Sequence, residues 1–423
     1  TMLAQIVRMV ENAQGAKLPI QALVDRVTGI FVPIVMGLAV LTVLVWLLLG
    51  PDPALSLALV AGVSVLIIAC PCAMGLATPT SIMVGTGRAA DMGVLFRKGE
   101  ALQTLHDVRL IAFDKTGTLT LGQPDVIQCL PDGADDPLRY AAALEAQSDH
   151  PVARAVVRAA AHLAVEQTEV AQVRAEPGQG ISGTVDGKPV HVGTAHYFET
   201  LGIPLGPFSN LGAEMESLGQ TVSYVSVDRS IAMVFGVSDQ IKPTSKAAIA
   251  ALHDMGIETA LVTGDNHGAA RAVATEVGVK HVNAKTLPQD KAHIVAGFQE
   301  RHGSVAFVGD GINDAPALAM ADTGIAIGTG TDVAIEAADV VLMSGDLMGV
   351  VNAIRISRAT FRNIRQNLFW AFAYNAALIP VAAGLLYPLW GVMLSPMLAS
   401  AAMGLSSVFV LSNALRLRRL KLG

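Results

Sequence analysis

The residue of this chain best placed for covalent chemistry is a carboxylate in a short motif. The motif runs from Asp114 to Thr120 and reads Asp-Lys-Thr-Gly-Thr-Leu-Thr, directly after the apolar run Leu110–Phe113. Such a run predicts a buried strand, so Asp114 would emerge at its carboxyl end, where open α/β sheets place their chemistry. A carboxylate there can attack a phosphoryl group and become an aspartyl-phosphate.

Further residues suited to phosphate chemistry follow along the chain. Thr263 offers a hydroxyl and a backbone N–H to phosphoryl oxygens, and Lys291 can neutralise their charge. Asp310 and Asp314, in Gly-Asp-Gly-Ile-Asn-Asp, can hold Mg²⁺ against the phosphate. We expect four strand ends to bring these groups together, with the backbone carbonyl of Thr116 as a further Mg²⁺ ligand.

The motif and the downstream Gly-rich segment together resemble the phosphorylation site of P-type ATPases, the ion pumps that pass through an aspartyl-phosphate. The order of the residues is similar to the haloacid-dehalogenase-like phosphotransferase core to which those pumps belong. The resemblance implies that Asp114, Lys291 and Thr263 are catalytic and that Asp114 is also a Mg²⁺ ligand. Gly264 and Asp265, which follow Thr263, would contact the cofactor.

The residue two positions after Asp114 distinguishes a pump from a phosphatase. Soluble phosphatases of that superfamily typically carry an Asp there as general acid and base, so the acyl-phosphate is hydrolysed quickly. This chain has Thr116, whose hydroxyl is a poor proton shuttle at neutral pH. The aspartyl-phosphate should therefore persist long enough to couple to a conformational change, which argues against the alternative of a membrane-anchored phosphatase.

One helix start further along reads Ser-Asp-His-Pro, from residue 148 to 151. It resembles the Ser-Glu-His-Pro motif of heavy-metal P-type ATPases, with Asp149 in place of Glu. The resemblance implies that His150 stacks on or hydrogen-bonds an adenine and that Glu145 reads the base. It also implies that Gly178 and Gly180 let the backbone approach the nucleotide closely.

Cys70, Pro71 and Cys72 lie within a long charge-free stretch. A proline inside a helix removes one backbone hydrogen bond and kinks the helix, which leaves a carbonyl free at membrane depth. The flanking thiols are soft ligands that suit monovalent copper or silver, and also zinc, cadmium or lead. Beside a P-type ATPase core, Cys-Pro-Cys resembles the heavy-metal branch of these pumps.

The last apolar region distinguishes between metals. It contains Asn367, then Tyr374-Asn375 after six residues and Pro380 after four more, and further on Met403 with Ser406-Ser407 after two residues. This spacing is similar to that of the copper(I)-exporting group. With the two cysteines, the Cu⁺ ligands implied are Tyr374, Asn375, Met403, Ser406 and Ser407. Divalent-metal pumps carry a Lys and an Asp in this region, whereas residues 366–415 here contain no charge. A zinc, cadmium or lead pump of the same family stays the alternative.

The composition predicts a membrane protein, because 52% hydrophobic residues is too many for a purely soluble chain. A charge-free helix of about 20 residues reaches about 30 Å, the thickness of the hydrocarbon core. The predicted spans are residues 30–49, 54–84, 368–386 and 393–411. Basic residues flank them on the side of both termini and of the large central region, which we therefore expect in the cytosol, with the spans in the plasma (inner) membrane.

Other classes of function are excluded or weakened. The net charge is −6, and no basic, aromatic-rich patch suggests a nucleic acid partner. Three cysteines cannot form a disulfide framework in a chain of this size, and Cys129 is expected to be a buried small hydrophobe. A metal-binding membrane module without catalysis would keep the cysteines but would not need the acidic and basic groups near Asp114.

The predicted fold is an α-helical membrane domain plus α/β, with a haloacid-dehalogenase-like doubly wound phosphorylation domain and an inserted α+β nucleotide-binding domain. The alternation of helix and strand that resumes after Ser238 supports the parallel sheet. We expect residues 1–25 to leave a missing actuator domain, 26–87 to form two transmembrane helices, 88–120 and 238–350 the phosphorylation domain, 121–237 the nucleotide-binding domain, and 351–423 two transmembrane helices with a basic C-terminus.

The resemblance covers essentially all 423 residues, but it is to the carboxyl-terminal portion of a copper(I)-exporting ATPase. Such pumps begin with metal-binding domains, four more spans and an actuator domain with a Thr-Gly-Glu loop, and no Thr-Gly-Glu occurs here. Because the first residue is Thr1 rather than Met, we expect a fragment. The resemblance implies ATP and Mg²⁺ as cofactors, Cu⁺ or Ag⁺ as the ion, the lipid bilayer as surroundings and a cytosolic copper chaperone as a candidate donor.

Overall fold

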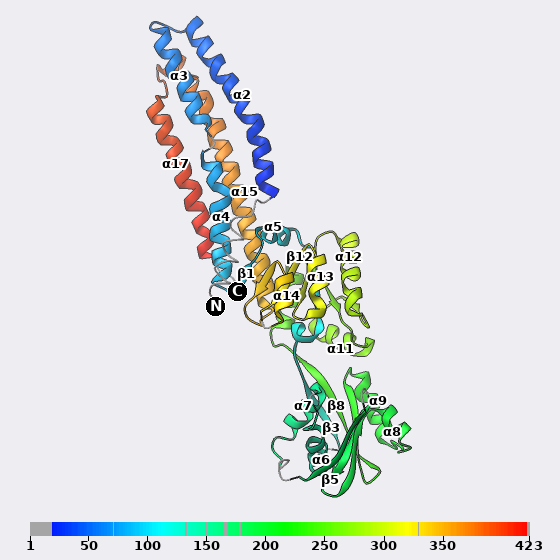
Figure 1. The fold of residues 1–423 in the computed structure, drawn as a ribbon. Coiled ribbons are helices and arrows are strands. Elements are labelled where there is room, and N and C mark those ends of the chain that lie inside the picture. Colours follow the sequence, from blue (N-terminus) through cyan, green and yellow to red (C-terminus); the bar gives the residue numbers. More distant parts are fainter. Residues whose placement is uncertain are drawn as a thin grey trace. The chain divides into compact units, whose positions relative to one another are not determined.

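In the computed structural model the described residues are 19–420, without 71, 132, 149, 164–167, 177, 178 and 329. The chain divides into two compact units (Figure 1). The first comprises residues 1–108, 338–344 and 349–423, and the second comprises 109–337 and 345–348. Most of the predicted actuator-leaving segment, up to residue 18, lies outside the described residues.

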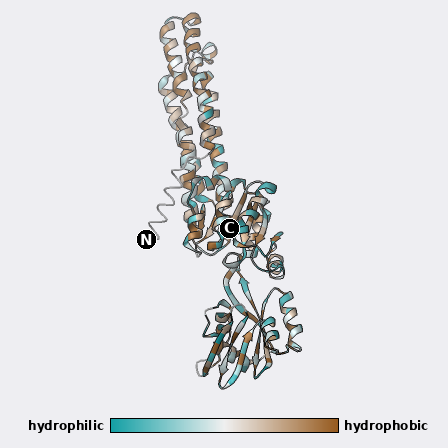
Figure 2. Cartoon of the chain, turned by 45° about the vertical axis from the view of Figure 1, so that its right-hand side comes forward, coloured by the Kyte–Doolittle hydropathy of each residue, from teal (hydrophilic) through white to brown (hydrophobic). Residues whose placement is uncertain are grey.

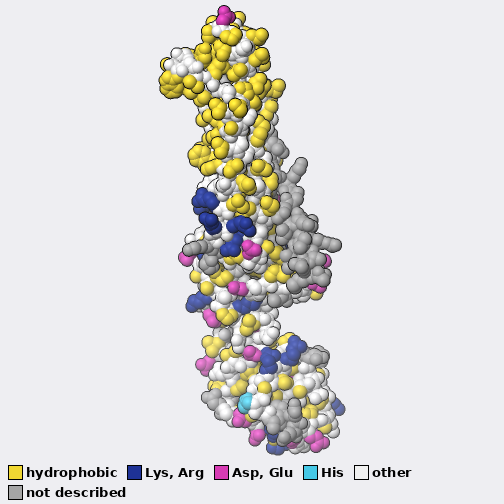
Figure 3. All heavy atoms as spheres, turned by 90° about the vertical axis from the view of Figure 1, so that its left-hand side faces the viewer, with side chains coloured by type: hydrophobic (Ala, Val, Ile, Leu, Met, Phe, Trp, Pro, Cys, Tyr) yellow, Lys and Arg dark blue, Asp and Glu magenta, His cyan; other side chains and the backbone are white. Residues whose placement is uncertain are grey.

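The first unit is built mainly of long helices. Helix α2 packs against α3, and α17 packs against both α3 and α4. Many hydrophobic residues lie along these helices (Figure 2), and hydrophobic side chains cover most of the bundle surface that is in view in Figure 3. The helices of this unit are α2 (Pro19–Leu49), α3 (Ala54–Ala69), α4 (Cys72–Ala90), α5 (Gly99–Asp107), α15 (Met348–Ala382), α16 (Tyr387–Trp390) and α17 (Pro396–Leu415), and β1 (Val94–Phe96) pairs antiparallel with β13 (Val340–Leu342).

Three helical stretches of the described chain are long and apolar enough to cross a membrane, namely residues 26–49, 54–90 and 396–419. They match three of the four predicted spans. The predicted span at 368–386 is not among them. Its helix, α15, ends at Ala382, and the charge-free part of this helix carries the polar residues Asn367, Tyr374 and Asn375, which lower its hydropathy.

The predicted span at 54–84 is two helices rather than one kinked helix. Helix α3 ends at Ala69 and α4 begins at Cys72, while Pro71 lies outside the described residues. The Cys70 N–H donates to the carbonyl of Ile67 at 3.2 Å, and the Cys72 N–H donates to the carbonyl of Cys70 at 2.8 Å. The regular helical bonding is therefore interrupted beside the proline, as a residue without an N–H requires.

A buried polar network joins α4, α15 and α17. The Asn413 side-chain amide donates to Asn367 Oδ1 at 2.8 Å, and the Asn367 amide donates to Ser81 Oγ at 3.2 Å. The Asn363 amide donates to the backbone carbonyl of Asn413 at 2.9 Å. Polar groups surrounded by apolar helices are costly unless they pair with one another, so this network specifies how the three helices pack.

The second unit contains a parallel sheet with strands in the order β12-β11-β2-β9-β10. The register pairs Asp114 of β2 with Val262 of β9, and Phe113 with Val308 of β11. The carboxyl ends of these three strands therefore meet at one edge. The elements are β2 (Leu110–Asp114), α10 (Ser245–Asp254), β9 (Glu258–Val262), α11 (His267–Val277), β10 (His281–Asn283), α12 (Lys291–His302), β11 (Val305–Gly309), α13 (Ala315–Met320), β12 (Thr323–Ile327) and α14 (Asp332–Ala337).

An antiparallel sheet of order β3-β8-β7-β6-β5-β4 is inserted between β2 and α10. This confirms the predicted doubly wound core with an α+β insertion. Within the insertion, α6 ends at Glu145 and α7 begins at Pro151, at the helix start predicted from Ser-Asp-His-Pro. The elements are β3 (Thr120–Leu130), α6 (Asp135–Glu145), α7 (Pro151–Ala159), β4 (Val170–Glu176), β5 (Gly180–Val185), β6 (Lys188–Gly193), α8 (Ala195–Thr200), α9 (Phe208–Ser217), β7 (Thr221–Val227) and β8 (Ser230–Ile241).

Two glycines of α4 allow a test of the bundle packing. A Cβ at Gly85 would overlap the side chain of Thr360 on α15, whereas a Cβ at Gly87 would have no atom within 4 Å. Both Gly→Ala changes gain the same helix propensity, so their difference isolates the contact. We expect Gly85→Ala to be less stable than Gly87→Ala by about 1–3 kcal/mol, the usual cost of overpacking. Thermal unfolding in detergent measures this, and equal midpoints would contradict the packing.

Candidate functional site

The centre of the second unit is a buried ion pair at the carboxyl end of β2. Asp114 is the last residue of this strand and is 7% exposed. The Lys291 ammonium donates to Asp114 Oδ1 at 2.6 Å and to Asp314 Oδ1 at 2.7 Å. The structure therefore brings together three of the residues that the sequence pattern assigns to phosphoryl transfer.

The site carries more negative charge than its lysine can balance. Burial, reinforced by the charge of Asp314, raises the pKa of Asp114 to about 7, although Lys291 opposes the rise. Burial and Asp314 also raise the pKa of Asp310. Burial lowers the pKa of Lys291, but Asp114 and Asp314 outweigh it and raise the pKa overall. A bound cation would relieve the surplus of negative charge.

The donor set fits Mg²⁺. Carboxylate oxygens of Asp114, Asp310 and Asp314 lie within 4.8 Å of one another. Oxygen ligands of this kind are those that Mg²⁺ prefers. The backbone also requires glycine here, because Gly117 has a φ of +73° and a Cβ on it would overlap the Asp310 carboxylate. The glycine of the motif thus makes room for Asp310, which directly follows the distant strand β11.

These groups line a cleft of about 440 Å³ that also includes Thr116, Thr263 and Asn313. Two details differ from the sequence prediction. Lys291 does not follow a strand but is the first residue of α12, after a short 3₁₀ turn. The backbone N–H of Thr263 donates to the carbonyl of Asn283 at 2.9 Å, because β10 continues the sheet beside β9, so the hydroxyl is the group of Thr263 left to contact a phosphoryl oxygen.

Gly264 and Asp265, expected to contact the cofactor, also line this cleft. The Asp265 carboxylate pairs with the ammonium of Lys115, the residue after the nucleophile candidate. The N–H of Asp265 donates to the Thr263 hydroxyl at 3.2 Å. In this structure Asp265 therefore contacts another protein group, Lys115, and this pair positions the loop after β9 against the loop after β2.

Two residues of this region were missed in the sequence. Lys242 is buried, and its ammonium donates to the carbonyl of Gly117; burial lowers the pKa of Lys242. Asp239 accepts hydrogen bonds from the Thr120 hydroxyl and from the backbone N–H of Gly122 at 3.2 Å. Both lie in the segment Asp-Gln-Ile-Lys, residues 239–242, where the chain leaves the inserted sheet. Two charged residues at a domain boundary were the sequence signal that could have identified them.

A second pocket, of about 270 Å³, lies in the inserted domain. Glu145, His150 and Gly180 line it, together with Gln179 and Ser223, which no sequence pattern indicated. Glu145 is buried, and burial raises its pKa to about 7. The pocket therefore combines a poorly solvated carboxyl, an imidazole and small polar groups, a set that can recognise the edge and face of a base.

Local contacts explain the form of the His-Pro segment. His150 caps α7, and its Nδ1 accepts from the Val152 N–H at 3.3 Å. A neutral ring that accepts at Nδ1 carries its proton on Nε2, which remains a donor. Gly180 is required by the sheet itself, since a Cβ there would overlap Val192 of β6, so its need for glycine does not depend on a ligand. Gly178 and Asp149 lie outside the described residues.

The candidate ion site of the first unit lies at the break between α3 and α4. Cys70 and Cys72 are exposed, and neither forms a disulfide. The side-chain amide of Asn375, on α15, donates to the carbonyl of Cys70 at 3.5 Å, so the broken helix and α15 meet at this point. Tyr374, next to it on α15, is half-buried.

Helix α17 supplies the other predicted ligands. Met403 and Ser406 are buried on this helix, which packs against α3 and α4. The hydroxyls of Ser406 and Ser407 donate to the carbonyl of Met403 at 2.7 and 3.4 Å. Their oxygens keep lone pairs for another partner, although their protons are engaged within the helix.

Comparison with known proteins places this architecture in a family. A model described as haloacid dehalogenase-like hydrolase matches residues 108–322, and a second of the same description matches residues 293–354. Copper-transporting ATPase 1 of Rhizobium meliloti is 58% identical over 421 residues, which are 99% of this chain and 51% of that protein. A copper-exporting P-type ATPase of Legionella pneumophila is 50% identical over 424 residues, which are 100% of this chain and 58% of that protein.

The chain thus spans about half the length of the curated relatives it matches. A solved structure of a zinc-transporting PIB-type ATPase in its E2.Pi state superposes with a TM-score of 0.83 at 36% identity, covering 98% of this chain and 67% of that one. These matches, together with the buried Asp114–Lys291 pair and the inserted domain, show that the chain belongs to the PIB-type ATPases. This family is the heavy-metal branch of the P-type pumps within the haloacid dehalogenase-like superfamily.

Proposed function

We propose that this chain is the catalytic and membrane core of a pump that uses ATP to export Cu⁺, with Ag⁺ as a chemically similar ion, through an aspartyl-phosphate. The observation that carries the proposal is the Asp114 carboxylate, presented at the end of a buried strand and held by Lys291, with Thr116 two residues later. A phosphatase would need a general acid and base at the position of Thr116, and a threonine hydroxyl serves that role poorly.

The proposed transfer uses a carboxylate oxygen of Asp114 as the nucleophile. It attacks the γ-phosphorus of ATP, the bond to the β–γ bridging oxygen breaks, and ADP leaves with that electron pair. Lys291 and the Thr263 hydroxyl would stabilise the charge on the transferred group. Asp114, Asp310, Asp314 and the Thr116 carbonyl would hold Mg²⁺, which would supply further charge neutralisation there.

For the ion, the proposal assigns Cys70 and Cys72 as thiolate ligands, with Asn375 next to them. Two cysteine thiols lose their protons on binding, and the thiolates formed can compensate the charge of a soft monovalent ion without help from an acidic residue. Residues 366–415 contain no charged residue, whereas divalent-metal pumps of the family carry a Lys and an Asp in this region. This argument favours Cu⁺ over Zn²⁺, although a zinc-transporting pump shares the fold.

The site of action follows from the same features. Membership in this family and three long apolar helical stretches of the described chain indicate a membrane protein. We propose the plasma (inner) membrane, with the second unit, which carries Asp114 and the adenine pocket, on the cytosolic side, because basic residues flank the spans on that side. A cytosolic copper chaperone is the proposed donor of the ion.

The nucleophile assignment is tested by labelling. The full chain incubated with γ-labelled ATP and Mg²⁺ should form an acid-stable, hydroxylamine-labile adduct, and Asp114→Asn should abolish it because an amide cannot attack the phosphorus. Asp136→Asn, at an exposed acid of the inserted domain, should label like the parent. Labelling that survives Asp114→Asn would overturn the assignment.

The adenine pocket is tested by binding. In the full chain without Mg²⁺, His150→Gln and Glu145→Gln should each weaken ATP binding roughly tenfold, the equivalent of one lost hydrogen bond of about 1–1.5 kcal/mol. His196→Gln changes an exposed histidine of the same domain and serves as the control. Displacement of a fluorescent nucleotide measures the affinities. Affinities equal to the parent in both pocket variants would place the base elsewhere.

The metal assignment is tested through phosphoenzyme formation. Cu⁺ and Ag⁺ should raise the level of phosphoenzyme and Zn²⁺ should not. Cys70→Ser and Cys72→Ser should each abolish the rise, because a hydroxyl is a poor ligand for a soft ion. Cys129→Ser, at the half-buried cysteine of β3, is the matched control and should respond like the parent. Equal stimulation by Zn²⁺ would reject the choice of metal and leave the pump assignment standing.

A further inference from the structure

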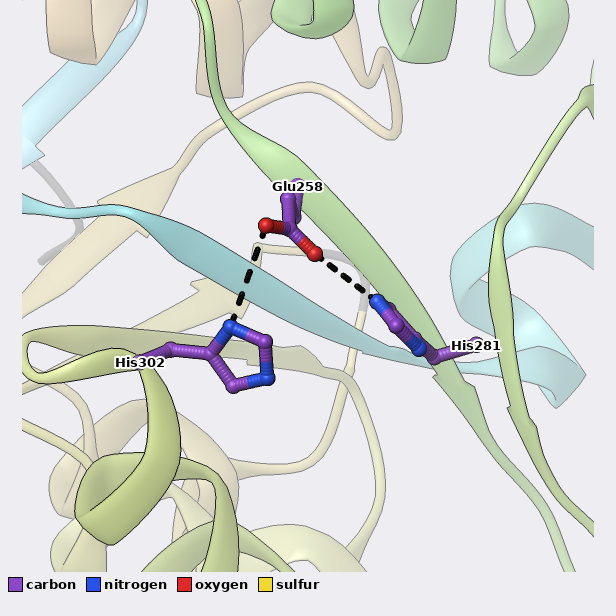
Figure 4. Close-up of side chains that lie close together, drawn as sticks. All are labelled: Glu258, His281 and His302. Carbon is purple, nitrogen blue, oxygen red and sulfur yellow. Dashed lines mark hydrogen bonds and ion pairs between the residues drawn. The ribbon is translucent and has the colours of Figure 1, made fainter.

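A second group of potential ligands lies at the amino ends of the parallel strands, opposite the ends that carry Asp114. Figure 4 shows these side chains. Glu258 is the first residue of β9, His281 is the first residue of β10, and His302 is the last residue of α12. The register of β2 and β9 pairs Glu258 with Leu110 at the start of β2 and Val262 with Asp114 at its end. The group is therefore separate from the phosphoryl-transfer cleft.

The sheet register explains why Glu258 and His281 meet. His281 pairs with Ala260 on the neighbouring strand, and Ala260 lies on the same face of β9 as Glu258, two residues away. The Nε2 atom of His281 is 2.8 Å from Oε2 of Glu258, and Nδ1 of His302 is 3.9 Å from Oε1 of Glu258. Each carboxylate oxygen thus faces a different imidazole, as Figure 4 shows.

The two imidazoles are placed close enough to share one ion. Their ring centroids are 5.7 Å apart with the planes at 63°, and Phe298 packs against the His302 ring at 6.2 Å. The candidate ligand atoms of all three residues lie within 4.8 Å of one another. Ligand atoms around a tetrahedral ion with bonds of about 2.1 Å lie about 3.4 Å apart, so a modest rotation of these side chains would close the site.

We propose that Glu258, His281 and His302 bind a divalent transition-metal ion of the Zn²⁺ class, with water in the remaining position. Two imidazoles and one carboxylate form a donor set that zinc takes in proteins, and the group has no thiolate that would select Cu⁺. The side chains of Glu258, His281 and His302 are 45%, 40% and 21% exposed, so an ion can reach them without opening the fold.

Such an ion would hold together two elements that also serve the phosphoryl-transfer cleft. Helix α12 begins at Lys291 and ends at His302, and β9 begins at Glu258 and ends just before Thr263. An ion bound by Glu258 and His302 would cross-link these elements at their far ends. Because it binds only the folded arrangement, it would also raise the stability of this unit by mass action.

Zn²⁺ binding to the full chain tests the proposal. The background carries Cys70→Ser, Cys72→Ser and Cys129→Ser, which removes every thiol, and excess Mg²⁺ competes for the carboxylates near Asp114. Competition with a chromophoric chelator should show one Zn²⁺ bound per chain. Glu258→Gln, His281→Gln and His302→Gln should each weaken binding by at least about tenfold, since removal of even an outer partner of a ligand costs this much.

A matched control and a second readout separate a metal site from a plain ion pair. His196 forms an exposed pair with Glu199 at 3.4 Å, and His196→Gln should leave Zn²⁺ binding unchanged. Bound Cu²⁺ should show electron paramagnetic resonance coupling to two imidazole nitrogens in the parent and to one in His281→Gln or His302→Gln. Metal-free melting midpoints establish that each variant is folded. Absence of Zn²⁺ binding in the parent, or equal affinity in the folded histidine variants, would overturn the proposal.

Discussion

The buried contact of Lys291 with two carboxylates is the interaction on which the second unit depends. Asp114 and Asp314 come from segments far apart in the chain, and in the interior they repel one another unless a cation lies between them. Lys291 supplies one positive charge, which leaves the carboxylates with an excess of negative charge that a second cation could balance. Glycine at Gly117 is part of the same constraint, because any side chain there would collide with Asp310. A fold that concentrates charge in this way is suited to transferring an anionic phosphoryl group.

The membrane unit solves a related problem with neutral groups. Its helices are covered with apolar side chains, so each internal polar group needs a partner within the bundle. The Ser81, Asn363, Asn367 and Asn413 network satisfies its members among themselves and links α4, α15 and α17. By contrast, at the break after Ala69 the Cys70 carbonyl accepts from the Cys72 N–H at 2.8 Å and from the Asn375 amide at 3.5 Å, and both thiols stay exposed. The well-satisfied network thus specifies the packing, while the break leaves sulfur atoms accessible to an ion.

The inserted domain is joined to the parallel sheet by two neighbouring strands, β3 and β8, whose first paired residues are Thr120 and Ile241. Asp239 and Lys242 bind the backbone and side chains of the phosphorylation motif at this junction. A change in the loop after Asp114 would therefore be felt at the root of the insertion. This is a physical route by which the pocket of the inserted domain and the cleft around Asp114 can influence each other.

The sequence by itself determined the strands that carry Asp114, Thr263 and Asp310, because a strand buried on both faces must be apolar throughout and polar residues then mark its end. It also located the helix break, since proline has no N–H to donate to the helix. The tertiary structure alone decided that Lys291 reaches the site from a helix, that the Thr263 N–H is used by Asn283, and that Lys242 supports Gly117. It alone assembled Glu258, His281 and His302, and the asparagine network. These contacts join residues distant in the chain, and a local pattern of hydropathy carries no information about which distant side chains share a charge or a hydrogen bond.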